Sequence, residues 1–151
     1  MPAEWHVGPT ITSARLGRLI VSVQAAESPG DQEWSEYLEW LQNGDVPVTE
    51  SRTLVRSFGG GPNALQREQL TEVVGGKASR PKSVVLTESL VVRGIGLALT
   101  WFNMSLRVLA PDEMERAIQY LELDEAEAVY ARRLLDEAIE RQRQQSRGVG
   151  T

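Results

Sequence analysis

Ser89 and Arg93 are the residues of this sequence best suited to handle an anion, because they lie four residues apart at the start of a predicted helix. A serine in this position caps the helix by accepting a backbone N–H, and a kinase can also phosphorylate it. A phosphate there would meet free N–H groups at the positive end of the helix. The cap and the phosphosite are compatible interpretations of Ser89.

Arg93 places a cation in the first turn of the same helix, where it opposes the helix dipole by up to ~1 kcal/mol. We therefore expect an anion nearby, which would be Glu88, another carboxylate of the chain or a bound ligand. An internal salt bridge is the simpler alternative. If a ligand binds, Ser89 and Arg93 are the residues expected to contact its anionic group.

A glycine loop, Gly59-Gly60-Gly61, separates a predicted strand from a predicted helix that begins near Asn63. Backbone N–H groups of such a loop can cradle a phosphate, and Arg67 on the following helix could point over it. No Lys-Ser/Thr pair follows the glycines, so the segment is not a P-loop. Gly60, Gly61, Asn63 and Arg67 are candidate ligand contacts, with a flexible turn as the alternative.

Catalytic chemistry finds little support in the sequence. The acidic pairs Asp112-Glu113 and Asp124-Glu125 each stand at a predicted helix start, where the helix dipole explains them. The chain has no cysteine and one histidine, His6, which excludes thiolate catalysis, disulfides and multi-histidine metal sites. His6 has no nucleophile or orienting acid near it in the sequence. We predict a non-enzymatic protein without cofactor or metal.

The composition is that of one ordinary globular domain. The 151 residues are 41% hydrophobic and 25% charged, which is enough for a single core. The net charge of −5 opposes binding to nucleic acid or anionic lipid. The most apolar stretch, Ser89–Phe102, contains Arg93 and two glycines and is shorter than the ~20 residues that span a bilayer. With no signal-peptide pattern at the N-terminus, we expect a cytoplasmic protein.

The spacing of apolar residues predicts an α/β chain in the order β-β-α-β-α-β-α-β-α-α. An N-terminal hairpin pairs Trp5–Thr12 with Arg18–Ala25 and turns around Ser13–Gly17. Later strands are predicted at Thr53–Phe58, Ser83–Leu86 and Leu106–Leu109, and helices start near Ser28, Asn63, Ser89, Pro111 and Asp124. Strands that alternate with helices favour parallel pairing. The predicted fold is therefore a small mixed, mainly parallel sheet of four to five strands with flanking helices.

Six short motifs occur in a recognisable order. They are Gly60-Gly61-Pro62-Asn63, Gln66-Arg67, Leu86-Thr87-Glu88-Ser89, Val92-Arg93-Gly94, Thr100-Trp101-Phe102 and Ala110-Pro111-Asp112-Glu113. In order and spacing they resemble the bacterial branch of the STAS superfamily, the sulfate transporter and anti-sigma-factor antagonist domains. The resemblance covers about residues 5–123 and implies a STAS-like domain over 1–123 that binds a protein partner and performs no catalysis.

The resemblance also implies a switch. In the best-known members of that family, a partner kinase phosphorylates a serine at the start of the helix after the third strand, and this phosphorylation controls binding. Ser89 is the nearest match by position. Its neighbour Glu88 stands where the family has an acidic or polar residue, and the usual Asp-Ser-Ser-Gly form is absent.

Residues 124–145 predict an additional C-terminal helix, followed by a flexible tail at 146–151. Ala131, Leu135 and Ala138 belong to a narrow stripe of small and apolar side chains on this helix. Such a stripe suits close helix packing, either against the chain's own domain or in a homodimer. Both alternatives stay open at this stage.

Trp40 is a further interface candidate, because it lies off the apolar stripe that Trp34, Tyr37 and Leu38 form on the first helix. Tryptophan is enriched at binding hot spots. Packing beneath the C-terminal helix is the alternative for this side chain. Glu33, on the same helix, is expected to face away from the stripe.

The sequence thus predicts a regulatory, non-enzymatic protein–protein interaction module of STAS-like fold. The alternative is a small-molecule or lipid-binding module of the same fold. That alternative predicts a sizeable apolar pocket bordered by Arg93 and the glycine loop.

Overall fold

A six-stranded mixed sheet forms the centre of the molecule in the computed structural model, which describes residues 2–74, 81–94 and 105–149. The strands lie side by side in chain order: β1 (Glu4–Val7), β2 (Ile11–Leu16), β3 (Leu19–Gln24), β4 (Arg52–Ser57), β5 (Lys82–Thr87) and β6 (Leu106–Leu109). The pairs β1–β2 and β2–β3 are antiparallel, and β3 to β6 are parallel. The α/β class and the mixed sheet are confirmed, whereas the expected four to five strands were too few.

The N-terminal region contains two tight turns where the sequence analysis expects one. Gly8 begins the first turn and donates its N–H to the carbonyl of Ile11 at 2.8 Å. Gly17, with a φ of 60°, reverses the chain between β2 and β3. The single strand expected at Trp5–Thr12 is therefore wrong, and Ser13–Gly17, expected as the turn, lies mostly in β2. Gly8-Pro9 is a turn signal that the hairpin interpretation did not use.

The α-helices appear where the sequence predicts them, and a short 3₁₀ turn before β4 was not predicted. They are α1 (Asp31–Gln42), the short 3₁₀ turn η1 (Val48–Glu50), α2 (Ala64–Val73), α4 (Met114–Tyr120) and α5 (Glu125–Val149). Gly30 is the N-cap of α1, whereas Ser28 was expected to cap it. Residues 90–94 are helical, as expected after Ser89, and the remainder of that predicted helix lies outside the described residues.

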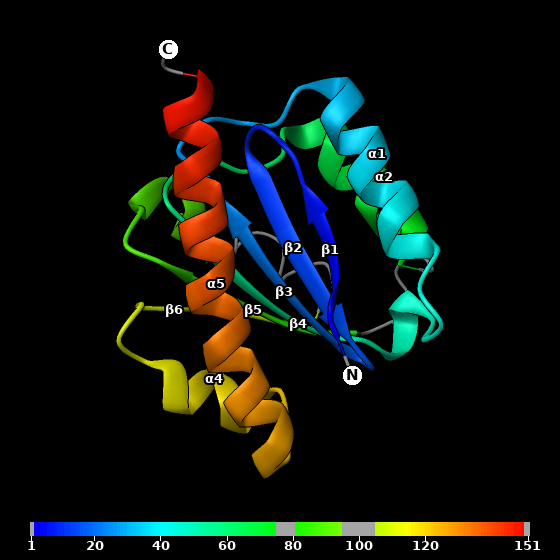
Figure 1. The fold of residues 1–151 in the computed structure, drawn as a ribbon, viewed down its shortest axis with the longest axis vertical. Coiled ribbons are helices and arrows are strands. Elements are labelled where there is room, and N and C mark those ends of the chain that lie inside the picture. Colours follow the sequence, from blue (N-terminus) through cyan, green and yellow to red (C-terminus); the bar gives the residue numbers. More distant parts are fainter. Residues whose placement is uncertain (1, 75–80, 95–104, 150–151) are drawn as a thin grey trace.

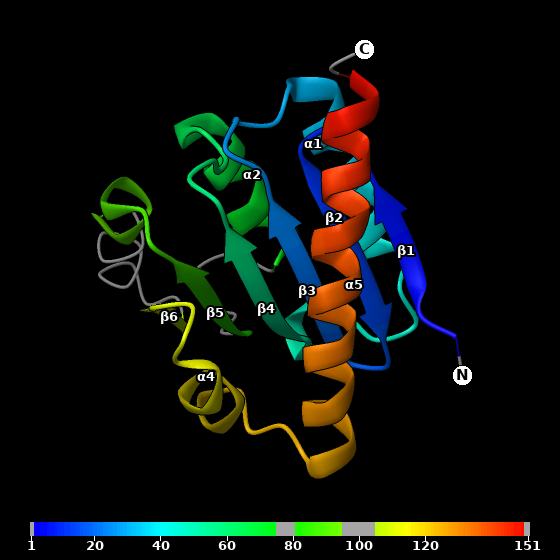
Figure 2. The same ribbon diagram turned by 60° about the vertical axis from the view of Figure 1, so that its left-hand side comes forward.

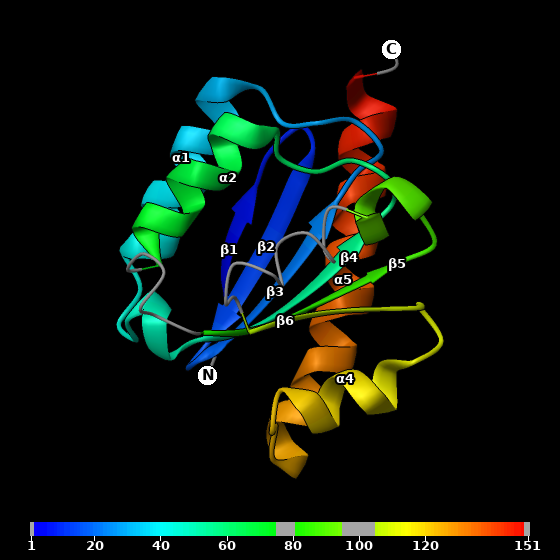
Figure 3. The ribbon, with the colours of Figure 1, turned by 180° about the vertical axis from the view of Figure 1, so that it is seen from behind.

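The helices cover both faces of the sheet (Figures 1 and 3). α1 and α2 lie together on one face, while α5 crosses β2 and β3 on the other face and α4 lies beside β5 (Figure 2). The arrowheads of β3, β4 and β5 point to the end of the molecule at which α5 finishes (Figure 2). The loops that follow these three strands therefore gather at one end of the molecule.

Each face of the sheet has its own apolar core. On the α4 and α5 face, the cluster of buried side chains comprises Ala14, Leu19, Val21, Leu54, Val84, Leu86, Ala117, Leu121, Ala131 and Leu134. On the other face, Ile11 and Ile20 pack against Trp34, Tyr37, Leu38 and Leu41 of α1. The alternation of side chains along each strand explains why both faces are apolar.

α5 docks on its own domain. Ala131 and Ala138 have 0% exposure, and Leu135 packs against the core at partial burial. Gln142 is buried, accepts the Thr12 hydroxyl at 2.7 Å and donates to the Pro9 carbonyl at 2.9 Å. The stripe therefore packs on the sheet, and its two alanines have no surface left for a dimer contact. The helix also extends through 146–149, which the sequence analysis assigns to a flexible tail.

Candidate functional site

The parallel strands end together and place three loops at one edge of the sheet, which we call the carboxyl edge. Gln24, Ser57 and Thr87 are aligned across β3, β4 and β5 and are the last residues of these strands. In open α/β sheets, binding sites form preferentially at this edge. The glycine loop follows β4, and Ser89 follows β5, so both motifs singled out in the sequence lie at the carboxyl edge.

Ser89 makes the expected capping hydrogen bond. Its hydroxyl accepts the N–H of Val92 at 3.3 Å, which is the third residue of the helical segment and the usual capping partner. The Ser89 N–H in turn donates to the Thr87 hydroxyl at 3.0 Å. The side chain is half-buried, so the cap accounts for its position, and its phosphorylation stays a prediction.

Arg93 does not form the internal salt bridge that is the simpler expectation. None of the ion pairs among the described residues includes it, and its Nε is buried without a hydrogen-bond partner there. Arg93 contributes weakly to the lowered pKa of Glu113. The larger causes of that lowering are the hydrogen bond from the Ala110 N–H and then the contact with Arg116. Glu88 is not its partner. Its role as an anion contact stays a prediction.

The glycine loop is held by hydrogen bonds and is not an open cradle. Gly60 donates its N–H to the Ala25 carbonyl at 3.0 Å, and Gly59 donates to the Ser57 hydroxyl at 3.2 Å. The Ser57 hydroxyl donates to the Gly60 carbonyl at 2.8 Å. Two of the three glycine amides are thus occupied, which removes the phosphate cradle that the sequence suggested.

Asn63 caps α2. Its side-chain oxygen accepts the N–H of Gln66 at 2.8 Å, and the Gln66 side chain accepts the N–H of Asn63 at 2.9 Å. This reciprocal pair is a capping box, which satisfies two N–H groups at the helix start. Asn63 therefore has a structural role, and its carboxamide oxygen is already engaged.

The carboxyl edge exposes large apolar side chains. Phe58, Leu90 and Val91 are 43%, 82% and 71% exposed. Val7 and Leu65, at the end of β1 and in the first turn of α2, are also exposed at this end. Of the six large apolar side chains exposed among the described residues, only Val129 on α5 lies elsewhere. Soluble proteins rarely gather such side chains without a binding role.

Two charged side chains, Arg56 and Glu88, lie near these apolar residues. The Arg56 guanidinium lies over the Phe58 ring at 4.2 Å and donates to the carbonyls of Ser57 and Leu86 at 2.8 and 3.4 Å. Burial lowers the pKa of Arg56, and the nearby Glu88 opposes this effect. We call Arg56, Phe58, Glu88, Leu90 and Val91 the edge patch. Leu90 and Val91 were not predicted as site residues, although both lie off the apolar spacing of the helix predicted after Ser89, which is Val92, Ile95, Leu99 and Phe102 in the sequence.

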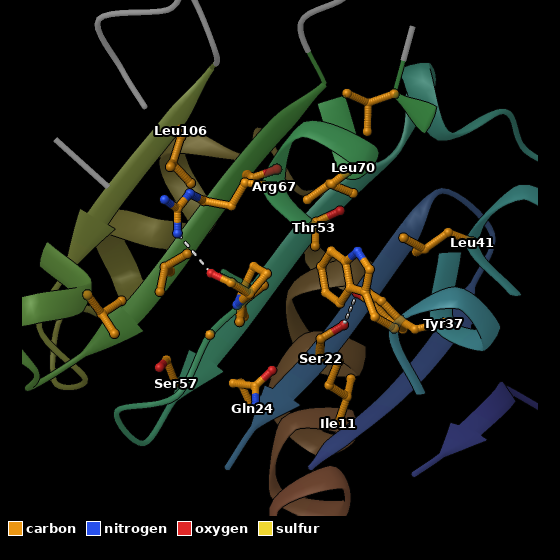
Figure 4. A pocket seen from close by; sticks show the side chains of 18 of the residues that line it. Ile11, Ser22, Gln24, Tyr37, Leu41, Thr53, Ser57, Arg67, Leu70 and Leu106 are labelled. Carbon is orange, nitrogen blue, oxygen red and sulfur yellow. Dashed lines mark hydrogen bonds between the residues drawn. The ribbon is translucent and has the colours of Figure 1, made fainter. Parts of the chain in front are cut away.

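A cavity of about 220 Å³ lies between the sheet and α1 and α2. Figure 4 shows its wall, with Ser22, Thr53 and Leu106 on the sheet side and Tyr37 and Leu70 on the helix side. Gly60, Gly61 and Arg67 line it as well, whereas Arg93, expected at its border, does not. All of these wall residues belong to the described part of the chain, which does not include 75–80 and 95–104.

The remaining interface candidate, Trp40, is half-buried on the α1 face and not beneath α5. The Arg15 guanidinium covers its ring at 4.1 Å and donates to its carbonyl at 2.7 Å. His6 and Tyr37 lie 5.9 and 6.3 Å from it, between ring centroids. Trp40 is therefore largely occupied by contacts within the chain.

His6 and Ser89 are too far apart to act together. β1 is separated from β5 by three strands, a distance of about 19 Å at the usual strand spacing. Burial lowers the pKa of His6.

Within 2–74, 81–94 and 105–149, no group of three or more His, Asp or Glu side chains could hold a metal ion.

Comparisons with known proteins add no assignment, because no family model, curated protein or solved structure matches the chain. None of the helices in the described part of the chain is both long enough and apolar enough to cross a bilayer.

Proposed function

We propose that this chain is a non-enzymatic module that recognises a protein partner through the edge patch. The observation that carries the proposal is the exposure of Phe58, Leu90 and Val91 at the carboxyl edge. Such side chains are costly to leave in water, and their grouping at one edge of the sheet favours a protein interface. Phe58 and Leu90 follow neighbouring strands, so one partner surface can contact both.

The charge at the patch suggests what the partner presents. Arg56 is half-buried and belongs to none of the ion pairs among the described residues. All aspartates and glutamates of the chain lie within those residues. A desolvated arginine without a carboxylate partner attracts one from a bound protein, since such pairs can form two parallel hydrogen bonds. The partner surface is therefore expected to combine an apolar side chain with a carboxylate.

A regulatory role is the part of the proposal that comes from the STAS resemblance. Ser89 stands directly before Leu90 and Val91, so a phosphate on it would place about two negative charges beside the apolar contact. That change would weaken an interface with an acidic partner through repulsion and desolvation. A cytoplasmic, bacterial signalling module is the setting that this resemblance implies, and membership of the family is itself part of the proposal.

The test compares partner capture by the wild-type chain and by two charge variants. Leu90→Glu places a carboxylate on the edge patch, and Val129→Glu places one on an exposed apolar residue of α5. Both changes are at exposed positions, where substitutions shift stability by about 0.5 kcal/mol or less. Each immobilised chain is incubated with lysate of the source organism, and bound proteins are quantified by mass spectrometry.

We expect at least one protein bound saturably by the wild type and Val129→Glu and reduced about tenfold or more by Leu90→Glu. Ser89→Asp should reduce the same protein, while Ser89→Ala should retain it. Equal capture by Leu90→Glu and Val129→Glu would contradict the edge patch as the interface. A Ser89→Asp variant that binds like wild type would contradict only the switch.

A further inference from the structure

Short side chains on one face of the sheet form part of the cavity wall. On the face that packs against α4 and α5, the central strands carry Leu54, Val84 and Leu86 in the core. On the opposite face, the corresponding wall positions include Thr53, Ser57 and Ser83. The two serines are smaller than leucine or valine, and the threonine has about the size of valine but carries a hydroxyl. This part of the wall is therefore less bulky and more polar than the opposite face of the sheet.

Most of the wall is apolar. Val55, Val85 and Val108 face the cavity from three neighbouring strands, and Leu41 and Leu70 face it from α1 and α2. On the α1 side, the Tyr37 hydroxyl is hydrogen-bonded to that of Ser22 at 3.0 Å. An apolar wall with a few polar groups is the usual form of a small-molecule site.

Arg67 is the exception in this wall. Figure 4 shows its side chain extending from α2 across the cavity toward Leu106. One guanidinium nitrogen, Nη1, donates to the Pro62 carbonyl at 2.8 Å. None of the ion pairs among the described residues includes Arg67, and every carboxylate side chain of the protein lies within those residues. Arg67 is half-buried, and an anionic ligand in the cavity would supply the carboxylate partner that the chain itself does not.

We propose that this cavity binds a small carboxylic acid with an apolar body, whose carboxylate meets Arg67. The apolar body would lie against Val55, Val85 and Leu70. An apolar cavity of about 150 Å³ is enough for one benzene ring, so 220 Å³ fits a body of roughly eight carbons. The site lies on the α1 and α2 face, and none of the five residues of the edge patch lines it.

The experiment titrates the purified full-length chain with octanoate in an isothermal calorimeter, below the concentration at which octanoate forms micelles. 1-Octanol and octylamine, which have the same chain with a neutral or a cationic end, serve as ligand controls. Arg67→Gln removes the charge, and Arg133→Gln removes an exposed arginine of α5 that has no ion pair among the described residues. Ser83→Leu fills the cavity without altering Arg67. Circular dichroism and thermal unfolding check the fold of each variant.

We expect saturable binding of one octanoate per chain, weakened about tenfold or more in Arg67→Gln and unchanged in Arg133→Gln. 1-Octanol and octylamine should bind at least tenfold more weakly, and Ser83→Leu should bind no octanoate. The Leu90→Glu variant should bind octanoate like the wild type, which separates this site from the edge patch. Absence of saturable octanoate binding, or equal binding by Arg67→Gln and the wild type, would overturn the proposal. So would octanol binding as tight as that of octanoate.

Discussion

Gly60 shows how neighbouring backbone atoms can fix the identity of one residue. A Cβ built on Gly60 would lie 2.3 Å from the carbonyl oxygens of both Ala25 and Glu27. The loops after β3 and β4 therefore touch at this residue, and any side chain would force them apart. A Cβ on the next residue, Gly61, would meet nothing within 4 Å. The glycine at position 60 thus serves close packing at the carboxyl edge.

This contrast gives a prediction with a built-in control. Gly60→Ala should lower the free energy of unfolding by about 1–3 kcal/mol or more, because the clash involves backbone atoms that cannot move independently. Gly61→Ala should leave stability unchanged or raise it by about 0.4–1 kcal/mol through a less flexible unfolded chain. Urea unfolding followed by tryptophan fluorescence measures both. Equal losses in the two variants would show that the loop contact is not as described.

At the scale of elements, α5 is the helix whose role the sequence left open. Packing on the chain's own domain and packing in a homodimer were both open, and Gln142 joins the helix to both Thr12 in β2 and Pro9 in the preceding turn. Arg141 adds a contact by lying over the Trp5 ring at 4.0 Å. α5 therefore closes one face of the sheet and is part of the core.

Removing the Gln142 amide should test this docking. Gln142→Ala leaves the buried Thr12 hydroxyl without its partner, at an expected cost of about 1–3 kcal/mol, and it also removes the hydrogen bond to the carbonyl of the exposed Pro9. Gln144→Ala, at an exposed position two residues later, should change stability by about 0.5 kcal/mol or less. Chemical denaturation of both variants provides the comparison. A Gln142→Ala variant as stable as Gln144→Ala would contradict docking of α5 on the sheet.

Element positions were largely predictable where the local pattern is strong. β6 matches its predicted range, and β4 and β5 differ by one residue at each end, because short apolar runs between turn signals identify buried strands. The N-terminal hairpin failed because β2 is buried on both faces and shows no alternation from which to choose a register. Glu33, expected to face away from the core, is buried instead, since its carboxylate accepts the N–H groups of Thr10 and Ile11 at 2.8 and 2.9 Å. Ile11 is 22 residues from Glu33 in the sequence, so the local pattern around Glu33 does not predict this hydrogen bond.

The candidate site was predictable only in part for the same reason. The Ser89 cap follows from local sequence and is present. The apolar exposure of Leu90 and Val91 could have been inferred from their position off the helical stripe. The cavity could not, because its wall combines side chains from the strands with others from α1 and α2. The sequence also does not show whether Arg67 has an ion-pair partner, because that depends on how the strands, α1 and α2 pack around it.

At the scale of the whole molecule, the two ends of the sheet differ in character. At the amino end of the strands, Arg18 pairs with Glu127 at 2.9 Å, and Lys82 pairs with Glu122. The Arg18 hydrogen bond is the main cause of the lowered pKa of Glu127. Arg18 and Lys82 at this end are thus paired within the chain, whereas the carboxyl end exposes Phe58, Leu90 and Val91. This asymmetry is the basis for placing the function at the carboxyl edge.

The most direct measurement is photocrosslinking in living cells of the source organism. A photoreactive phenylalanine analogue replaces Leu90 in one variant and Val129 in another, and the adducts are resolved by size after illumination. The account predicts a discrete adduct with another protein at position 90 and none at position 129. Adducts of equal yield at both positions, or none at position 90, would contradict recognition through the carboxyl edge.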